Sequence, residues 1–316
     1  MRTNETLART RASNAEYLVD NPDRSACDVD VFDFDCDPPL ISIVIPTLND
    51  VDTIEDCLSS FKSQKYPCLE IVIIDGESTD GTVSIAEQYA DTVVTETGTL
   101  GAARAAGLEV ANGEIIGMFD ADIYLPDEDW LLRAAIRFNY SRSVSTVWPE
   151  NTSPPDGTAL TKLYFDHWHI IMEDRIKNDR SYFGGGNSLF RRDYLEDAGG
   201  INRDYHWGED FEWAKRLKEH GCQTVYHRDP IYHDTMRNFN EFATTQFVGA
   251  NSFSESGFEA TGMGVTMHAY EQFVLGTYGM ILGLMRGEHS WALFPIYMMI
   301  RATAYSRVLV SPYYGE

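Results

Sequence analysis

The stretch Ile115-Ile-Gly-Met-Phe-Asp-Ala-Asp122 decides the fold, because it reads as a buried strand that ends in two carboxylates one residue apart. Unpaired buried carboxylates are costly, so folding alone explains Asp120 and Asp122 poorly unless a cation neutralises them. Side chains alternate along an extended chain, so both can reach one oxygen-preferring ion, Mg2+ or Mn2+. The alternative is a solvated strand-to-helix turn in which aspartate caps the helix.

Apolar runs and helical patterns alternate on both sides of this stretch. The sequence predicts strands at 40–46, 69–75, 92–95 and 114–120 and helices at 52–64, 79–90, 100–111 and 127–140. Continuous runs such as Ile41–Ile45 and Ile71–Ile74 are typical of strands covered on both faces. We therefore predict an α/β fold with a mostly parallel, Rossmann-like central sheet flanked by helices.

Three polar clusters follow predicted strands, at Pro46–Asn49, Asp75–Asp80 and Asp120–Asp122. In doubly wound sheets ligands bind beyond the carboxyl ends of the strands, so the clusters predict one shared site. The segment Gly101–Gly107 opens a helix with small residues and carries Arg104, whose charge can serve a phosphate or pair with a surface acid.

The composition is that of an acidic globular protein. The 316 residues carry 49 acidic and 25 basic side chains, a formal net charge of −24, with 43% hydrophobic residues. A packed core with its acids on the surface is typical of a protein that stays hydrated in concentrated salt, so we expect a halophilic source. No basic stripe is present to neutralise phosphates, so nucleic acid is not an expected partner.

The cysteines form no Cys-x-x-Cys pair, and the first residues are polar. The expectations are therefore reduced thiols, no signal peptide and a cytoplasmic protein. Residues 1–38 lack apolar periodicity and are rich in aspartate, which predicts a flexible acidic arm.

In order, the motifs resemble those of the family 2 glycosyltransferases, a large inverting group with the GT-A fold that uses nucleotide-diphosphate sugars. The matching stretches are Ile43–Asn49, Asp75–Thr82, Gly101–Gly107, Ala111–Asp122 and Gly208–Asp210. The third departs from the family, whose members often carry Arg-Asn before the glycine, whereas this chain has Arg104-Ala-Ala-Gly107. The resemblance covers residues 39–235, with a nucleotide-binding half (39–148) and an acceptor half (149–235).

The resemblance also implies roles for individual residues. Pro46, Thr47 and Asn49 would border the base and ribose, and Asp75 would hydrogen-bond the nucleobase, often uracil. Gly101 and Arg104 would lie beside the bound nucleotide. Asp120 and Asp122 would hold ribose, metal and diphosphate. The donor would thus be a nucleotide-diphosphate sugar, expected to be a UDP-sugar.

The acceptor half carries the residues expected to handle proton transfer. An inverting transfer needs a base for the acceptor hydroxyl, and a carboxylate at a cleft-facing helix start can supply it. The resemblance puts this role on Asp210, next to Glu209; plain helix capping by the two acids is the alternative. The loop 183–188 would line the acceptor pocket. His233 is the expected third metal ligand, although a lone histidine can also be structural.

Residues 236–316 are expected to form a C-terminal helical region. Within it, residues 272–315 hold three Arg and one Glu, and the apolar runs 273–285 and 291–300 are too short to span a bilayer. A helical hairpin in the membrane interface, a buried helical subdomain and a dimer surface all fit this pattern.

The sequence therefore predicts a metal-dependent glycosyltransferase, peripheral on the cytoplasmic membrane face. Its expected acceptor is a lipid-linked saccharide or polyprenyl phosphate in the assembly of a surface glycan or protein N-glycan. The rivals are a nucleotidyltransferase, which would normally show a glycine- and arginine-rich phosphate loop, and an inactive nucleotide-sugar-binding scaffold.

Overall fold

The structure is a computed structural model that describes residues 17–19, 38–177, 186–206, 208–255 and 262–310. Nine strands form one sheet within these residues. Its order is β1 (Tyr17–Val19), β9 (Gln223–His233), β7 (Val144–Thr152), β8 (Ser188–Arg191), β5 (Ile115–Met118), β2 (Ile41–Thr47), β3 (Leu69–Asp75) and β4 (Thr92–Thr95), with β6 (Ile123–Tyr124) paired to β9.

Neighbouring strands along this order run parallel except at β8, which lies antiparallel between β5 and β7. Two reversals restore the direction, so β7 and β9 point the same way as β2, β3 and β5. The carboxyl ends of these five strands consequently meet at one edge of the sheet, where the polar clusters lie.

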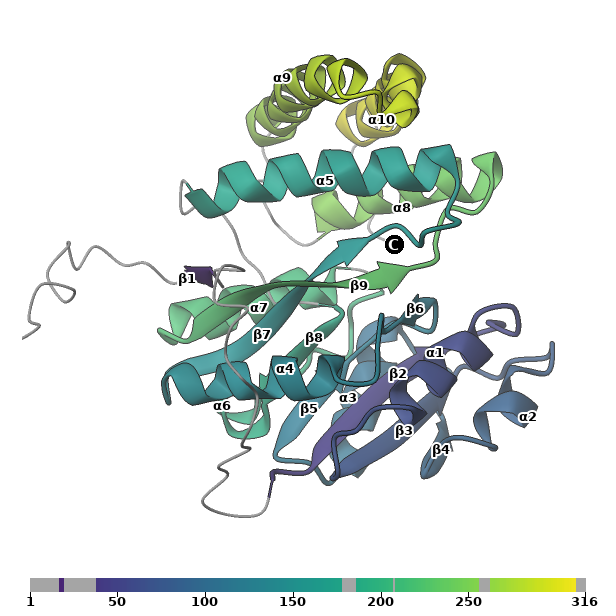
Figure 1. Cartoon of the computed structure of the whole chain (residues 1–316), viewed down its shortest axis with the longest axis vertical. Coiled ribbons are helices and arrows are strands. Elements are labelled where there is room, and N and C mark those ends of the chain that lie inside the picture. The colour runs from purple at the N-terminus through teal and green to yellow at the C-terminus, as the bar shows by residue number, and fades with distance from the viewer. Residues whose placement is uncertain (1–16, 20–37, 178–185, 207, 256–261, 311–316) are drawn as a thin grey trace, which may run out of the picture.

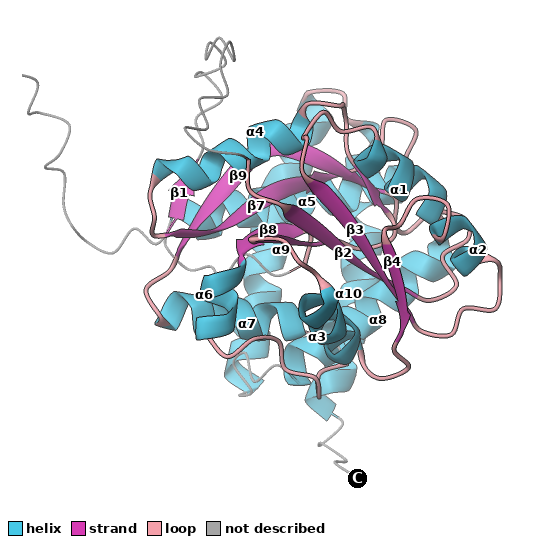
Figure 2. Cartoon of the chain, turned by 90° about the horizontal axis from the view of Figure 1, so that it is seen from below, coloured by secondary structure: helices cyan, strands magenta, loops and turns pink. Residues whose placement is uncertain are grey.

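Helices cover both faces of the sheet (Figure 2). One face carries α1 (Ile54–Lys62), α2 (Thr82–Ala86) and α4 (Trp130–Ile136), the other α3 (Leu100–Val110), α6 (Arg192–Asp197) and α7 (Glu209–Glu219). The strands alternate between the two resulting cores: Ile43 and Ile45 pack in the first, and Val44 packs in the second. This two-sided burial explains the uninterrupted apolar runs and confirms the predicted fold class.

Two of the predicted helices are shorter in the structure than in the sequence prediction. The segment 79–90 begins its helix only at Thr82, because the Asp80 side chain accepts from the Thr82 backbone N–H (3.1 Å) and holds the preceding residues in a turn. The segment 127–140 is split into α4 and a 3-10 turn at Arg137–Tyr140. The two strands predicted at 69–75 and 92–95 have those bounds in the structure.

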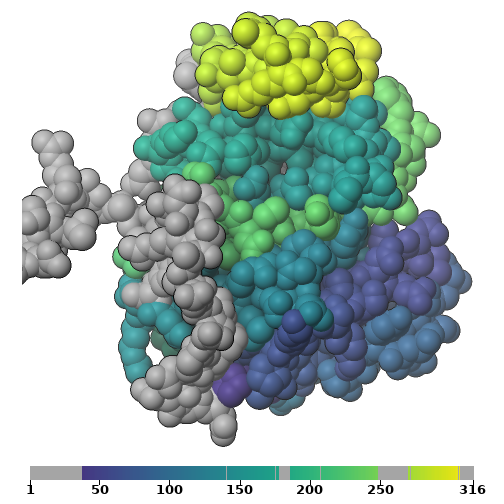
Figure 3. Space-filling view, in the orientation of Figure 1, coloured from purple at the N-terminus to yellow at the C-terminus, as the bar shows by residue number. Residues whose placement is uncertain are grey.

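A further layer of helices lies above the sheet (Figure 1). It consists of α5 (Ala159–Lys177), α8 (Phe239–Glu255), α9 (Gly262–Met285), a 3-10 turn at His289–Leu293 and α10 (Phe294–Val310). Figure 3 shows this C-terminal layer lying directly on the rest of the molecule; α9 packs on α5, and α10 packs on α8 and α9. Trp291, Phe294 and Tyr297 form the core of the layer with Leu163 and Phe242. The predicted C-terminal helical region is therefore present.

His167 ties α5 to the C-terminal helices. Its Nε2–H donates to the Gln272 carbonyl oxygen (3.0 Å), and its Nδ1 accepts from the Tyr297 hydroxyl (2.9 Å). Burial and the nearby Arg301 charge lower the pKa of His167 to about 3, so the ring is neutral. Within the described residues, no helix is long and apolar enough to cross a membrane.

The expected acidic arm lies mostly outside the described residues. Its described part, Tyr17–Val19, forms β1 and pairs in parallel with Thr224–Tyr226 of β9. This strand was not expected from the sequence, because three residues carry too little periodicity to be read.

Gly107→Ala should destabilise the fold. A Cβ at this position in α3 would overlap the Val44 Cγ1 atom of β2. Overpacking costs about 1–3 kcal/mol, which exceeds the gain of about 1 kcal/mol from replacing glycine in a helix. The midpoint of denaturant unfolding should therefore fall. Gly76→Ala is the control, because its Cβ would meet the tip of the exposed Leu48 side chain; equal midpoints for both variants would contradict the packing account.

Candidate active site

The carboxyl edge of the sheet brings together the three expected metal ligands. Asp120 and Asp122 follow β5, and His233 ends β9. One ligand atom from each lies within 4.8 Å of the others, and His233 Nε2 is 3.0 Å from Asp122 Oδ1. Two carboxylates and an imidazole are a donor set that suits Mn2+ and accommodates Mg2+. The residues present therefore fit a divalent ion.

The Asp122–His233 pair is strongly polarised. Burial disfavours both charges, but each charge stabilises the other, so the pKa of Asp122 falls below its usual value. The pKa of His233 rises to about 9, because Asp122 and then Asp120 outweigh the effect of burial. In the absence of an ion the imidazolium thus neutralises part of the negative charge at this edge.

Arg104 joins the metal cluster to the start of α7. Its guanidinium is buried and donates to Asp120 Oδ1 (2.7 Å) through one Nη atom and to Glu209 Oε1 through the other. It also lies over the ring of Trp213, 5.5 Å from the centroid. The sequence predicted that Arg104 would bind either a phosphate or a surface acid. In the structure it pairs with two carboxylates, of which Glu209 is buried.

Glu209 and Asp210 open α7 but differ in exposure. Glu209 is 2% exposed, and burial raises its pKa to about 7 despite Arg104. Asp210 is partly exposed, and its Oδ2 accepts weakly from the Gly186 N–H (3.3 Å). Burial also raises the pKa of Asp210, whereas Arg104 lowers it. Of these two acids, only Asp210 combines a partly accessible carboxylate with a raised pKa.

The expected nucleotide-binding residues lie at the ends of β2 and β3. The Thr47 hydroxyl donates to Asp75 Oδ1 (3.3 Å), and Asp75 Oδ2 accepts from the Ser78 N–H (3.0 Å). Asn49 has φ 59° and accepts from the Thr79 N–H (2.9 Å). Pro46 pairs with Ile74 across the two strands. The two loops are thus held together by their own polar groups.

Gly101 lies in the first turn of α3 and contacts the loop before α7. Its N–H donates to the Tyr205 carbonyl (3.0 Å), and a Cβ would overlap the Asn202 carbonyl oxygen. The small residue at this position therefore serves the close approach of α3 to the loop before α7.

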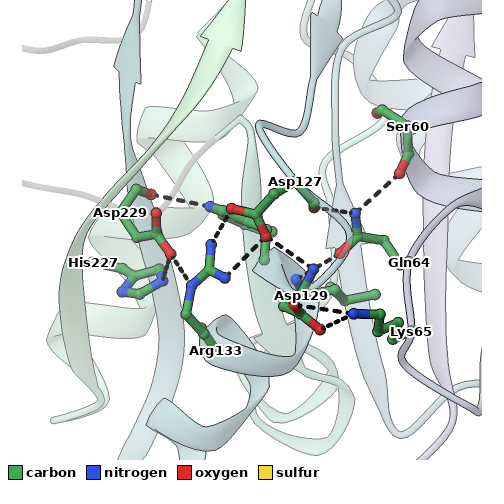
Figure 4. Close-up of polar contacts among 10 residues, drawn as sticks. Ser60, Gln64, Lys65, Asp127, Asp129, Arg133, His227 and Asp229 are labelled. Atoms are coloured by element: carbon green, nitrogen blue, oxygen red, sulfur yellow. Dashed lines mark hydrogen bonds and ion pairs between the residues drawn. The ribbon is translucent and has the colours of Figure 1, made fainter. Parts of the chain in front are cut away.

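His227 lies beside a different group of polar residues, which Figure 4 shows. Arg133 of α4 donates through Nε to Asp229 Oδ2 (2.6 Å). Its Nη1 and Nη2 atoms donate to Asp127 Oδ1 (2.9 Å) and Oδ2 (2.8 Å). His227 is buried on that side, 3.7 Å from the same Asp229 oxygen. Of the two histidines around Asp229-Pro230, His233 alone reaches Asp122.

Asn187 belongs to the loop 183–188 that was expected to line the acceptor pocket, but its contact with Asp120 was not expected from the sequence. Its Oδ1 accepts from the Asp120 N–H (2.8 Å), and its Nδ2 donates to Asp120 Oδ2 (2.9 Å). The side chain is buried and the backbone has φ 57°, a strained value for this residue. Its place after the glycine run was the only available signal. The adjoining residues 183–185 of the expected acceptor loop lie outside the described residues.

Asp50 is an acid near the cluster that the sequence did not assign. Burial, opposed by a hydrogen bond from Leu48 N–H (2.8 Å) and assisted by the charge of Asp122, raises its pKa to about 6. A third carboxylate so close to the metal cluster adds to the field that would attract a cation.

This sheet, with the acid and histidine cluster at its carboxyl edge, is the arrangement that the family resemblance predicted for a glycosyltransferase. The chain belongs to glycosyltransferase family 2: residues 42–199 match the family described as Glycosyl transferase family 2. It is 30% identical over 220 residues to Glycosyltransferase AglE of Haloferax volcanii, covering 66% of this chain and 71% of AglE.

Other relatives share the fold or part of the sequence. A poly(ribitol-phosphate) beta-glucosyltransferase of Bacillus spizizenii is 39% identical over 168 residues, which is 50% of this chain and 26% of that protein. The mannosyltransferase PcManGT of Pyrobaculum calidifontis, solved with GDP-Man and Mn2+, aligns with a TM-score of 0.57 at 20% identity over 85% of this chain and 88% of that chain. S. aureus TarS with UDP-GlcNAc aligns at 0.51 and 16% identity, over 87% and 93%.

Proposed function

We propose that the protein is an inverting, metal-dependent transferase that moves a sugar from a nucleotide-diphosphate sugar, a UDP-sugar, to an acceptor hydroxyl. The observation that carries this proposal is the Asp120, Asp122 and His233 cluster linked through Arg104 to the acids at the start of α7. The half at 39–148 would bind the donor, and the half at 149–235 would receive the acceptor.

Asp120, Asp122 and His233 would hold Mg2+ or Mn2+, which when bound supplies positive charge for the departing diphosphate. Thr47, Asn49 and Asp75 would line the nucleoside pocket between β2 and β3, with Pro46 at its border. Their mutual hydrogen bonds keep these loops in place before the donor arrives.

Asp210 would act as the base. The acceptor oxygen forms a bond to the anomeric carbon while the bond from that carbon to the diphosphate oxygen breaks, and the hydroxyl proton passes to Asp210. Attack opposite the leaving group inverts the anomeric centre. Glu209 is buried on Arg104 and is assigned a positioning role, since an acceptor could not reach it.

The donor class is tested by titrating the protein with UDP, GDP and their sugars, with and without Mn2+ or Mg2+. We expect metal-dependent binding of one nucleotide and its sugar, with UDP preferred. Failure of every nucleotide to bind under either metal would overturn the transferase proposal.

Arg104→Gln should lower turnover and move the acid limb of the pH–rate profile to higher pH. The Arg104 charge lowers the pKa of Asp210, so its loss lets the base stay protonated up to a higher pH. Arg104→Lys keeps the charge and should restore the limb in part. An unshifted limb in the glutamine variant, with folding checked by circular dichroism, would argue against Asp210 as the titrating group.

The C-terminal helices support a peripheral membrane location, on the cytoplasmic face as the sequence suggested. Several large apolar side chains are exposed on α9 and α10: Tyr270, Phe273, Val274, Tyr278, Ile281, Leu284, Met285, Ile296 and Met299. Exposed apolar side chains gathered on these two helices of an otherwise acidic protein suit the lipid interface. An acceptor carried by a lipid in glycan assembly is consistent with that surface, and the acidic composition is consistent with a halophilic source.

Ile281→Glu with Met285→Glu should abolish cosedimentation with phosphatidylglycerol vesicles. Both side chains are exposed on α9, where carboxylates would oppose insertion and repel the anionic lipid. Val110→Glu, a substitution at the exposed end of α3, is the matched control and should pellet with the vesicles like the wild type. A wild-type protein that stays in the supernatant would remove the membrane proposal and leave the enzyme untouched.

A further inference from the structure

A cavity of about 610 Å3 lies between the end of β7, the length of α5 and the inner side of α9. We call it the α5 groove. It follows α5 from Phe165 to Lys177, about 18 Å at 1.5 Å per residue. This volume lies within the range of about 300–1,000 Å3 that is typical of sites for small ligands. None of its lining residues has a role in the cluster, the nucleoside pocket or the base described above.

Two contacts connect the α5 groove to the metal cluster. Asn151 lines the groove, and its Oδ1 is 3.4 Å from Asn187 Nδ2, the same atom that donates to Asp120. Phe165 also lines the groove, and its ring centroid is 5.6 Å from that of His233. A molecule in the groove therefore ends beside the place where the transferred sugar would be held.

The polar lining of the groove is net acidic. Five carboxylates, Glu150, Asp166, Glu173, Asp174 and Glu288, face three permanent cations, Lys177, Arg228 and Arg286, and one histidine, His169. Two of these cations form ion pairs with Glu173. Arg228 Nη2 is 2.7 Å from its Oε1, and Lys177 Nζ is 3.4 Å from its Oε2. His169 Nδ1 is 2.7 Å from Glu150. A phosphate entering the groove would therefore meet a lining of net negative charge.

The same lining suits an uncharged sugar. Ionised carboxylates are acceptors only, and sugar hydroxyls are donors that match them. The exposed ring of Tyr278 supplies apolar surface for one face of a sugar ring. On the outer side, Leu275 and Leu282 of α9 continue the wall toward the exposed apolar face of that helix. An apolar chain could leave the groove along this path.

We propose that the α5 groove binds the acceptor and that the acceptor is an uncharged saccharide carried on an apolar chain, not a lipid phosphate. This inference rests on the proposed transferase function. The sequence left two acceptors open, a lipid-linked saccharide and a polyprenyl phosphate. The excess of carboxylates in the groove favours the saccharide, because its hydroxyls can donate to them whereas a phosphate is repelled.

The test compares ligands that share a chain and differ in head group. Octyl β-D-glucoside, octyl galactoside and octyl mannoside are titrated against octyl phosphate below their micelle concentrations, followed by calorimetry on the full chain with donor nucleotide and Mn2+ present. We expect at least one octyl glycoside to bind at least 10-fold more tightly than octyl phosphate. Tighter or equal binding of octyl phosphate, or binding of neither, would overturn the inference.

Glu150→Gln locates the binding. It removes one carboxylate from the groove while keeping the side-chain size, and should weaken the octyl glycoside by about 10-fold, close to the loss of one charged hydrogen bond. Glu128→Gln removes an exposed carboxylate that pairs with Lys65 far from the groove, and should change nothing. Equal effects of the two variants would place the ligand elsewhere. The donor titration is read separately, so its failure would overturn the transferase proposal itself, whereas a preference for octyl phosphate with intact donor binding would overturn this inference alone.

Discussion

Asp210→Asn should reduce the turnover number for sugar transfer by about 10²–10⁴-fold, the range that a general base contributes. The asparagine keeps the size of the side chain and can still face the Gly186 N–H, but it cannot accept the hydroxyl proton. Affinity for the nucleotide should change less than about twofold, because the substitution leaves the metal cluster and the β2–β3 loops intact. Stopped-assay kcat values and a nucleotide titration measure the two effects.

Glu219→Gln is the control for this experiment. It removes an exposed acid from the last turn of the same helix, where Lys215 is 4.0 Å away, so helix charge changes without touching the cleft. Near wild-type kcat in the control with a large loss in Asp210→Asn would assign the base. A kcat reduced less than tenfold in Asp210→Asn would transfer that role to another group.

Asp122→Asn should weaken Mn2+ binding by at least about 100-fold, because loss of a direct ligand costs more than the 10–100-fold typical of residues behind the ligands. The asparagine also removes the charge that holds the pKa of His233 high. Metal-dependent nucleotide binding should be lost with it, while binding without metal should be unchanged. Calorimetry with Mn2+ alone, and then with nucleotide, separates the two events.

Asp129→Asn serves as the comparison, since Asp129 is a partly exposed acid at the start of α4 that pairs with Lys65. His233→Gln should behave like Asp122→Asn with a smaller loss, because two carboxylates remain. Undiminished Mn2+ affinity in Asp122→Asn would show that the three residues form an ion pair and not a metal site.

The central strands could be read from the sequence because their signal is local. Residues such as Ile43, Val44 and Ile45 are buried alternately in two cores, so the run is apolar apart from the buried Ser42, and its predicted bounds lie within one residue of those of β2. The Asp120 and Asp122 pair was equally readable, since alternation along one strand end is a local property. The role of His233 as a metal ligand could be predicted only from the family resemblance, because His233 lies 111 positions after Asp122 in the sequence.

Other features depend on contacts that no local pattern encodes. The antiparallel insertion of β8 between β5 and β7 is a choice of strand partner, and the four residues Ser188–Arg191 carry no mark of their direction. The pairing of Arg104 with Asp120 and Glu209 joins positions from two halves of the chain. The α5 groove forms because the C-terminal helices pack on α5. The apolar runs alone could not predict this packing, since they fitted an interfacial hairpin, a buried subdomain and a dimer surface equally well.

The glycines of α9 have a consequence for how this enzyme could change. At Gly276, Gly279 and Gly283 an added methyl group would collide with Phe294 or Trp291, so the helix sits as near to its neighbours as a polypeptide backbone allows. Any larger residue there would lift α9 outward and enlarge the space beneath it. Single substitutions in this one helix could therefore change the range of substrates step by step, without altering Asp120, Asp122 or Asp210.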